Sequence, residues 1–296
     1  MQTSTLDIFT SDQHHFQATL YPADMAGAPT LIFLCALGTP ARIYARLARE
    51  LAQQGINVCI PDWRGIGSSS IRATRDVDFG YYQLLEIDHP ALLEALRKRY
   101  PAAPVWLGGH SLGGQLSLLA ASSAKLSVDG VLLVASGTVH LPCYPSKLRA
   151  GIRAVTLLVR LSGSVLGYFP GDRLGFGGRE ALGVMRDWSH VARTGKYKVA
   201  KSAVNYEHAL SELKTSIGAL TFAGDAWAPA NATQALIKKA EKSNQTHWHW
   251  SREDTQGYNI DHFSWLKRPE LVAPTIAAHI IEISTANART IERKPG

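Results

Sequence analysis

The segment GGHSLGGQ, residues 108–115, places a serine between glycines in the pattern G-x-S-x-G. An apolar run precedes it and a helix-forming run follows, so it predicts a tight turn from a strand into a helix. Such a turn projects the oxygen of Ser111 above the edge of a sheet, and the flanking glycines avoid side-chain collisions. The N-terminus of the following helix offers free N–H groups to a developing oxyanion. Ser111 is therefore a candidate nucleophile.

A glycine-rich turn can also bind a phosphate group or simply start a helix. A Rossmann fingerprint needs G-x-G-x-x-G on the first βα turn, and a P-loop needs G-x-x-x-x-G-K-[ST]. Segment 108–115 contains no Lys-Ser/Thr pair and lies in the third predicted βα unit. These features argue against phosphate or dinucleotide binding and leave a purely structural turn as the alternative to a nucleophile.

A serine nucleophile on such a turn needs an acid and a base, which follow it in the chain order Ser, Asp/Glu, His. Asp225 comes just after the apolar run 217–222, where a loop carboxylate can reach the carboxyl edge of the sheet. The preceding predicted strand, residues 128–136, ends without an acid. His262 lies in the loop before the last predicted helix. We therefore predict that Ser111, Asp225 and His262 form a catalytic triad.

The other histidines and loop carboxylates have simpler explanations. His110 lies inside the turn, and its side chain would point away from Ser111. His247 and His249 alternate along a predicted strand and share one face, which indicates a packed or surface pair rather than a metal site. Asp261 adjoins the candidate base, and solvation or local hydrogen bonding is the favoured role for it. No metal or organic cofactor is implied.

Two backbone N–H groups are predicted to form the oxyanion hole. One belongs to Leu112, the residue after the serine, and the other to the loop CALGTPARIY at residues 35–44. In enzymes with this type of turn, a His-Gly pair is common in the corresponding loop. Here Cys35 and Ala36 occupy the positions of that pair, so Leu37, the next residue, is the predicted second donor. Because the backbone donates, loss of the usual side chains need not abolish the hole.

The rest of the chain supplies the elements that position these residues. Two short apolar runs around a polar turn predict an opening hairpin at residues 6–21. Apolar strands then alternate with amphipathic helices, which predicts right-handed crossovers and a mostly parallel sheet. Further strands are predicted at residues 30–37, 56–62, 103–109, 128–136, 217–225 and 246–251, and helices at 38–55, 81–100, 112–124, 231–242 and 270–283.

The alternation lapses between about residues 137 and 216, which predicts an insertion. Within it, apolar residues recur at helical spacing (Leu148, Ile152, Val155, Val159) and either pack onto the core or line an acyl-binding cleft. Residues 186–188, Arg-Asp-Trp, are predicted to fix the insertion by polar contacts, with the tryptophan packed. The predicted organisation is a first core part at 1–137, a helical cap at 138–216, a second core part at 217–286 and a flexible tail at 287–296.

The composition excludes several other classes of protein. The chain has 296 residues, of which 46% are apolar, which suits one large α/β domain with an insertion or two small domains. No uninterrupted apolar run of about 18 residues occurs, and the first residues lack the basic and apolar regions of a signal peptide. Three cysteines (Cys35, Cys59, Cys143) cannot form a disulfide framework and suit a reducing compartment. We therefore expect a cytoplasmic protein.

The net charge of +7 is concentrated in one segment. Residues 138–210 contain 11 Lys or Arg and four Asp or Glu, while the remainder is neutral. This distribution is compatible with an anionic substrate or membrane surface, and equally with an ordinary basic surface. We expect a small-molecule substrate and no nucleic-acid partner.

Together, these residues resemble the α/β-hydrolase superfamily from about residue 5 to residue 285. The resemblance is carried by GHSLGG, Asp225, His262 and the loop DWRGIGSS, in which Asp62 and Arg64 are predicted to form a structural ion pair. The segments LGTPARIY, GYFPGDRLGFG, RDWSHVARTGKY, GDAWAP and DHFSW are similar to an uncharacterised bacterial branch of predicted α/β hydrolases.

The resemblance implies a mostly parallel eight-stranded sheet flanked by helices, with a helical cap inserted after the sixth strand. In this superfamily an aspartate nucleophile signals dehalogenases or epoxide hydrolases, so Ser111 implies a serine hydrolase instead. The expected activity is cleavage of an ester or thioester through an acyl-enzyme. Acyl transfer with the same triad and a catalytically silent ligand-binding protein on this fold are the alternatives.

Overall fold

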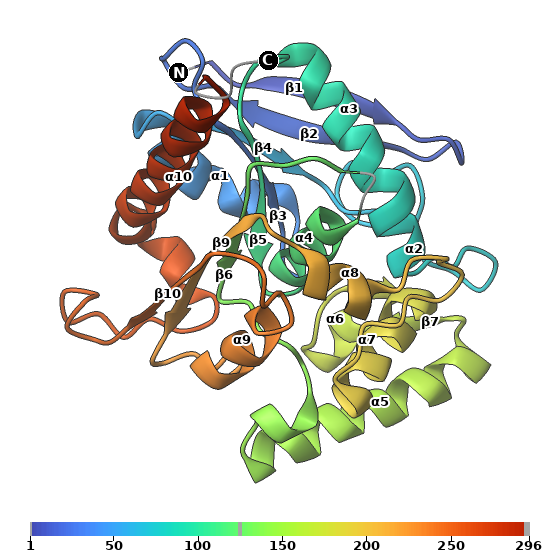
Figure 1. The fold of residues 1–296 in the computed structure, drawn as a ribbon. Coiled ribbons are helices and arrows are strands. Elements are labelled where there is room, and N and C mark those ends of the chain that lie inside the picture. Colours follow the sequence, from blue (N-terminus) through green and yellow to red (C-terminus); the bar gives the residue numbers. More distant parts are fainter. Residues whose placement is uncertain (1, 124–125, 293–296) are drawn as a thin grey trace.

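The computed structural model describes residues 2–123 and 126–292. Its centre is one eight-stranded sheet with the strand order β1-β2-β4-β3-β5-β6-β9-β10 (Figure 1). β2 runs antiparallel to both β1 and β4, and the other neighbouring pairs are parallel. The mostly parallel sheet predicted from the sequence is therefore confirmed, as is the opening hairpin. The strands are β1 (Ser4–Phe9), β2 (His15–Tyr21), β3 (Thr30–Leu34), β4 (Asn57–Pro61), β5 (Val105–His110), β6 (Gly130–Val134), β9 (Ser216–Phe222) and β10 (Gln245–Trp250).

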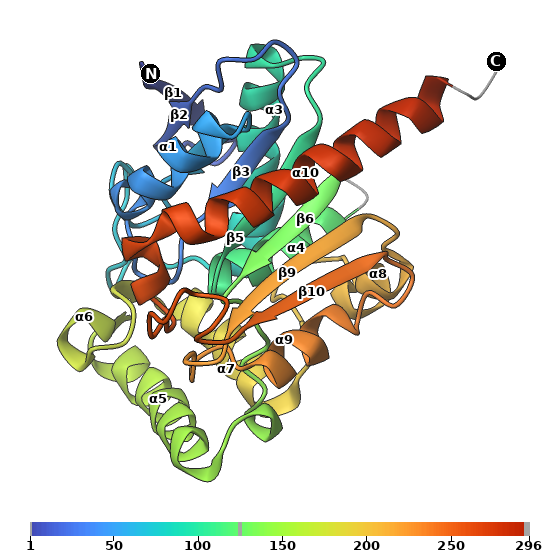
Figure 2. The same ribbon diagram turned by 90° about the vertical axis from the view of Figure 1, so that its left-hand side faces the viewer.

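Helices cover both faces of the sheet (Figure 2). On one face α1 (Ala45–Gln53) packs along α10 (Pro269–Glu292), and their apolar residues form one core with the strands. On the other face α4 (Leu112–Ser122) packs against β5, β6 and α8 (Tyr206–Glu212) in a second core. The central strands β3, β4, β5 and β6 are buried at every position, which explains why they form continuous apolar runs in the sequence.

The remaining core helices connect the strands. α9 (Ala230–Ile237) packs against β9. The helix expected near 81–100 begins as α2 (Tyr81–Gln83), widens into a π-helical turn, η2 (Leu84–Asp88), and continues as α3 (His89–Arg99). Short 3-10 turns lie before α1, before α5 and before α10, at η1 (Ala41–Tyr44), η3 (Leu141–Cys143) and η4 (Ser264–Lys267).

The segment between β6 and β9 lies over one end of the sheet (Figures 1 and 2). It contains α5 (Ser146–Val165), α6 (Gly171–Leu174), α7 (Leu182–Thr194) and α8, and also an antiparallel pair of short strands, β7 (Tyr168–Pro170) and β8 (Arg179–Ala181). The sequence did not predict this strand pair.

Helix α5 has two different faces. The predicted apolar stripe faces inward, with Ile152 and Val159 buried and two further residues of the stripe half-buried against the core. The opposite face carries Leu157, Leu161 and Val165, which are exposed. Among the described residues, no helix has the length and apolar character needed to cross a membrane.

Two details differ from the sequence-based expectations. Helix α10 continues to Glu292, into the segment 287–296 that was expected to be a flexible tail, while residues 293–296 lie outside the described residues. The predicted Asp62–Arg64 ion pair is wrong. Arg64 instead contacts Asp88 and Asp12, with nitrogen–oxygen distances of 2.6 and 2.7 Å, while Asp62 accepts hydrogen bonds from backbone N–H groups of the same loop and of η1.

Candidate active site

Ser111 forms the turn between β5 and α4. The strand ends at His110 and the helix begins at Leu112, so Ser111 takes the strained conformation φ 56°, ψ −121°. A Cβ on Gly109 would lie 2.5 Å from the backbone of Gly113, and a Cβ on Gly113 would lie 2.3 Å from the carbonyl oxygen of Leu34. The glycines on both sides are therefore required because the turn packs directly on backbone.

We expect Gly113→Ala to lower the free energy of unfolding by at least about 2 kcal/mol. The added methyl group would collide with carbonyl groups of Leu34 and Cys35, which cannot move without disturbing β3. Urea denaturation measures the change. Gly151→Ala is the matched control, since a Cβ there meets no atom within 4 Å, and it should leave stability unchanged or raise it by up to about 1 kcal/mol. A Gly113→Ala protein as stable as the control would contradict the packing argument.

The structure brings Ser111, His262 and Asp225 together at the carboxyl edge of the sheet. The Ser111 hydroxyl donates to His262 Nε2 at 3.0 Å, and His262 Nδ1–H donates to Asp225 Oδ2 at 2.9 Å. Asp225 is 3% exposed and His262 is 6% exposed. The arrangement has the geometry in which a histidine can take a proton from a serine while a carboxylate orients the ring.

Asp225 is held by the turn that follows β9. Its second oxygen, Oδ1, accepts hydrogen bonds from the backbone N–H groups of Trp227 at 2.8 Å and Ala228 at 2.9 Å. Because both bonds come from backbone, the carboxylate has one orientation, with Oδ2 directed at His262. The turn therefore fixes the direction from which the ring is contacted.

Local hydrogen bonds also fix the loop that carries His262. Asp261 Oδ1 accepts from the N–H groups of Phe263 and Ser264, and Trp265 Nε1 donates to the His262 carbonyl oxygen. Asp261 thus has the local hydrogen-bonding role that the sequence predicted. The loop thus directs the His262 ring toward Ser111. Asp261 holds the loop and is not part of the hydrogen-bonded series Ser111, His262 and Asp225.

His110 contacts the back of the candidate site. Its side chain is fully buried, and its ring centroid lies 4.7 Å from that of His262. The Tyr44 hydroxyl accepts a hydrogen bond from the Ala36 N–H at 2.8 Å and is hydrogen-bonded to His110 Nδ1 at 2.9 Å. Burial, together with the neighbouring His262, holds the pKa of His110 well below its usual value. A neutral His110 therefore links the His262 ring to the loop that follows β3.

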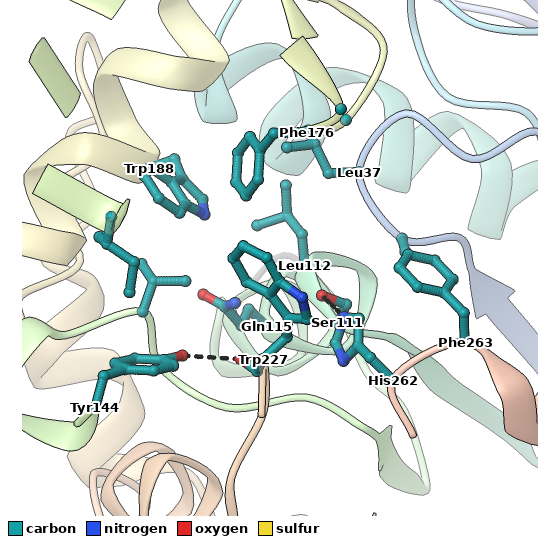
Figure 3. Close-up of a pocket in the computed structure, with 15 residues that line it drawn as sticks. Leu37, Ser111, Leu112, Gln115, Tyr144, Phe176, Trp188, Trp227, His262 and Phe263 are labelled. Carbon is teal, nitrogen blue, oxygen red and sulfur yellow. Dashed lines mark hydrogen bonds between the residues drawn. The ribbon is translucent and has the colours of Figure 1, made fainter. Parts of the chain in front are cut away.

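The two predicted oxyanion donors belong to residues that line the same cavity as Ser111. Leu112 is the first residue of α4, so its N–H has no partner within the helix. It lies at the positive end of the helix dipole. Leu37 follows β3 and lines the same cavity as Ser111 (Figure 3). Within the described part of the chain, neither N–H donates a hydrogen bond. Both groups are thus available to an oxygen that develops charge beside Ser111.

A cavity of about 140 Å³ opens over these groups. Its walls are mainly apolar and aromatic and come from both the sheet edge and the segment between β6 and β9 (Figure 3). The lining residues are Ala36, Leu37, Ser111, Leu112, Gln115, Val139, Tyr144, Ile152, Gly175, Phe176, Gly177, Trp188, Trp227, His262 and Phe263. Ile152 of the predicted stripe and the predicted packed Trp188 therefore both face the cavity.

The loop between β7 and β8 forms one wall of the cavity through Gly175, Phe176 and Gly177, and it packs closely on the loop after β3. A Cβ on Gly38 would lie 2.2 Å from the backbone nitrogen of Gly178. Below this contact Glu180 is buried, and its Oε1 accepts a hydrogen bond from the Gly178 N–H at 2.7 Å. The pKa of Glu180 is raised from 4.5 to about 7, mainly by burial; the Gly178 hydrogen bond lowers the pKa and the charge of Asp172 raises it, and both effects are included in that value.

We expect the wild-type protein to lose stability relative to Glu180→Gln as the pH rises from about 5 to about 8. A carboxyl group whose pKa rises on folding stabilises the folded state fully below its unfolded pKa of 4.5, and this stabilisation is lost as the pH passes about 7. The glutamine amide can keep the Gly178 bond but does not titrate. The free energy of unfolding of the wild-type protein, relative to that of Glu180→Gln, should fall by up to about 3 kcal/mol between about pH 5 and pH 8. Urea denaturation at several pH values tests this, and a constant difference would contradict it.

The other polar clusters have structural partners. His247 Nε2 and His249 Nδ1 both contact Thr221 Oγ1, at 2.9 and 3.0 Å, and His249 is exposed. This agrees with the packed or surface pair that the sequence predicted. In residues 2–123 and 126–292, no group of three or more His, Cys, Asp or Glu side chains is arranged to hold a metal ion.

Parts of the chain are similar in sequence to known hydrolytic enzymes. Residues 29–170 match the model of the family described as serine aminopeptidase, S33. The chain is 32% identical over 91 residues to the monoglyceride lipase of Rattus norvegicus, an alignment covering 31% of this chain and 29% of that enzyme. The chain therefore matches less than a third of the length of this curated relative.

Solved structures resemble the chain over nearly its whole length. A thermostable carboxyl esterase from Bacillus coagulans has a TM-score of 0.64 at 13% identity, covering 95% of this chain and 99% of the esterase. A loop variant of a haloalkane dehalogenase from Bradyrhizobium elkanii has a TM-score of 0.65 at 14% identity, covering 98% of this chain and 100% of the dehalogenase. At these identities the likeness establishes the fold, and the fold is that of the α/β hydrolases.

Several cavity residues were not singled out from the sequence. Phe176, Trp227 and Phe263 lie in loops, where an aromatic side chain has no periodicity to mark which way it faces. Gln115 had a signal that could have been used, because it is the one amide side chain among the Leu, Gly and Ser residues of the first two turns of α4, and it is buried. Buried polar groups in such positions need a partner.

Proposed function

We propose that the chain, which has the α/β-hydrolase fold, is a member of that superfamily and cleaves carboxylic esters or thioesters through an acyl-enzyme intermediate. The observation that carries the proposal is the hydrogen-bonded series Ser111, His262 and Asp225 at the wall of an apolar cavity. The similarity to a monoglyceride lipase supports an ester as the substrate.

In the first half of the proposed reaction, Ser111 Oγ attacks the carbonyl carbon while His262 Nε2 takes its proton. Asp225 stabilises the imidazolium through the Nδ1–H bond, and the N–H groups of Leu112 and Leu37 stabilise the oxyanion. The imidazolium then gives its proton to the leaving alcohol or thiol, and the acyl group stays on Ser111.

In the second half a water molecule attacks the acyl carbonyl, and His262 takes a proton from the water. A second tetrahedral oxyanion forms against the same two N–H groups and collapses, which releases the acid and returns the proton to Ser111. The segment 138–216 acts as a lid that keeps bulk water away from the acyl-enzyme. The cavity is smaller than the roughly 300–1,000 Å³ that is typical of drug-sized ligands, which favours short acyl groups.

Hydrolysis of p-nitrophenyl esters with acyl chains from two to sixteen carbons tests this function. We expect measurable turnover with the highest kcat/KM at short chains, and an early burst of p-nitrophenol equal to the enzyme concentration wherever deacylation is slow. Added alcohol acceptors separate hydrolysis from transfer, since transfer would give alkyl ester in place of the free acid. Absence of turnover on every ester, or turnover that persists after Ser111 is replaced, would contradict the proposal.

A further inference from the structure

We infer that Gln115 is a specificity-determining residue, which donates a hydrogen bond to an uncharged oxygen atom of the substrate. This inference rests on the proposed ester hydrolysis and goes beyond it, because it names the chemistry of the substrate away from the reacting carbonyl. Gln115 lies on α4 one helical turn after Ser111, a rise of about 6 Å along the helix axis. The recognised oxygen is therefore only a few bonds from the ester group.

The amide of Gln115 is held in one orientation. The residue is 2% exposed, and its Oε1 accepts a hydrogen bond from the hydroxyl of Tyr197 at 2.9 Å. Tyr197 is itself buried, and burial raises the pKa of its phenol, so it remains a proton donor. Because Tyr197 occupies the amide oxygen, the NH₂ end of Gln115 is directed elsewhere.

That NH₂ group faces the cavity. Figure 3 shows the Gln115 side chain directed into the space between Trp188 and Trp227, with its nitrogen on the cavity side. Among the residues that the structure describes, no acceptor receives a hydrogen bond from Nε2. Nε2 is not among the fully buried side-chain atoms without a partner in the described chain, so it can be reached from the cavity, where a ligand oxygen would accept a hydrogen bond from it.

A second donor points into the same space. The indole nitrogen of Trp188 is directed toward Gln115 in Figure 3, and Trp188 is 4% exposed. The Tyr144 hydroxyl, by contrast, already donates to backbone carbonyl oxygens of Thr138 and Trp227. The far end of the cavity thus offers N–H donors and apolar surface.

The lack of charged side chains around the cavity indicates which chemical class of substrate group binds there. No Lys, Arg, Asp or Glu is among the described residues that line the cavity. A carboxylate there would lose its hydration without a cation to compensate it, and an all-carbon group would leave the amide N–H unpaired. A keto, ether or second ester oxygen satisfies both requirements.

Paired substrates test the inference. The pairs are the p-nitrophenyl esters of 4-oxopentanoate and pentanoate, those of 5-oxohexanoate and hexanoate, and, on the alcohol side, 2-methoxyethyl and butyl butanoate. We expect the wild-type protein to prefer the oxygen-containing member of at least one pair by about 5- to 10-fold in kcat/KM. Gln115→Leu, which replaces the amide by an apolar side chain of comparable volume, should reduce that ratio to one or below. Tyr197→Phe should reduce it in part because the amide loses its orientation.

The ratio within a pair cancels any general loss of activity or folded protein, so a merely structural role of Gln115 would leave it unchanged. Gln54→Leu, at an exposed position, is the matched control and should keep the wild-type ratio. Ester turnover without any oxygen preference, or a preference that survives in Gln115→Leu, would overturn the inference and leave the proposed function intact. Absence of turnover on all six esters would instead overturn the proposed function.

Discussion

Replacement of Ser111 by alanine is expected to lower kcat on the best p-nitrophenyl ester by on the order of 10⁵-fold or more. The hydroxyl supplies the attacking oxygen, and no other hydroxyl is hydrogen-bonded to His262 within the described chain. The alanine side chain fits the strained turn at least as well as serine, so the protein should remain folded. Steady-state kinetics and circular dichroism together measure the effect.

Ser122→Ala is the matched control for this variant. It lies at the other end of α4, and its hydroxyl donates to the carbonyl oxygen of Leu119. Its kcat should be within about twofold of the wild-type value, since surface changes of this kind are worth up to about 0.5 kcal/mol. The double variant Ser111→Ala/His262→Ala should be little slower than Ser111→Ala alone, because the two residues act as one unit. A folded Ser111→Ala protein that keeps more than a hundredth of the activity would contradict the assignment.

Asp225→Asn is expected to lower kcat by about 10⁴-fold, with a much smaller change in KM. Asp225 Oδ1 accepts two backbone hydrogen bonds, so the asparagine keeps its oxygen on Trp227 and Ala228 and turns its NH₂ group toward His262. The ring must then accept at Nδ1 and carry its proton on Nε2. In that tautomer Nε2 cannot take the proton of Ser111.

Asp254→Asn separates this effect from the loss of any loop carboxylate. Asp254 accepts hydrogen bonds from the N–H and hydroxyl of Ser251, at 2.7 and 2.9 Å, and makes no contact with the histidine. Its kcat should stay close to the wild-type value. An Asp225→Asn enzyme as active as Asp254→Asn would show that the Asp225–His262 bond has no part in the reaction.

The three residues of the candidate triad could be predicted because each depends on local information. A glycine-flanked serine between a strand and a helix, and polar residues directly after later strands, indicate positions at one edge of a parallel sheet. The structure brings Ser111, Asp225 and His262 to that edge. The hydrogen-bonded residues Ser111 and His262 are 151 residues apart along the chain, and His262 and Asp225 are 37 residues apart. The parallel pairing of the central strands follows from the alternation of strands and helices, whereas the strand order comes from the structure.

Other features depended on contacts between distant segments. Arg64 contacts Asp12 and Asp88, 52 and 24 residues away, and nothing near it in the sequence distinguishes these partners from Asp62. The β7–β8 strands have three residues each, too short for any periodicity, and their conformation depends on packing against the loop at Gly38. The orientation of Gln115 likewise depends on Tyr197, 82 residues away.

The most direct test of the account is the site of covalent labelling by a fluorophosphonate, mapped by mass spectrometry on the intact folded protein. The reagent phosphonylates a serine only where a base activates it and an oxyanion hole stabilises the adduct. The account predicts one adduct, on Ser111, that disappears in Ser111→Ala and forms far more slowly in Asp225→Asn. A folded protein that forms no adduct, or that carries its adduct on another residue, would contradict the assignment of Ser111 as the nucleophile.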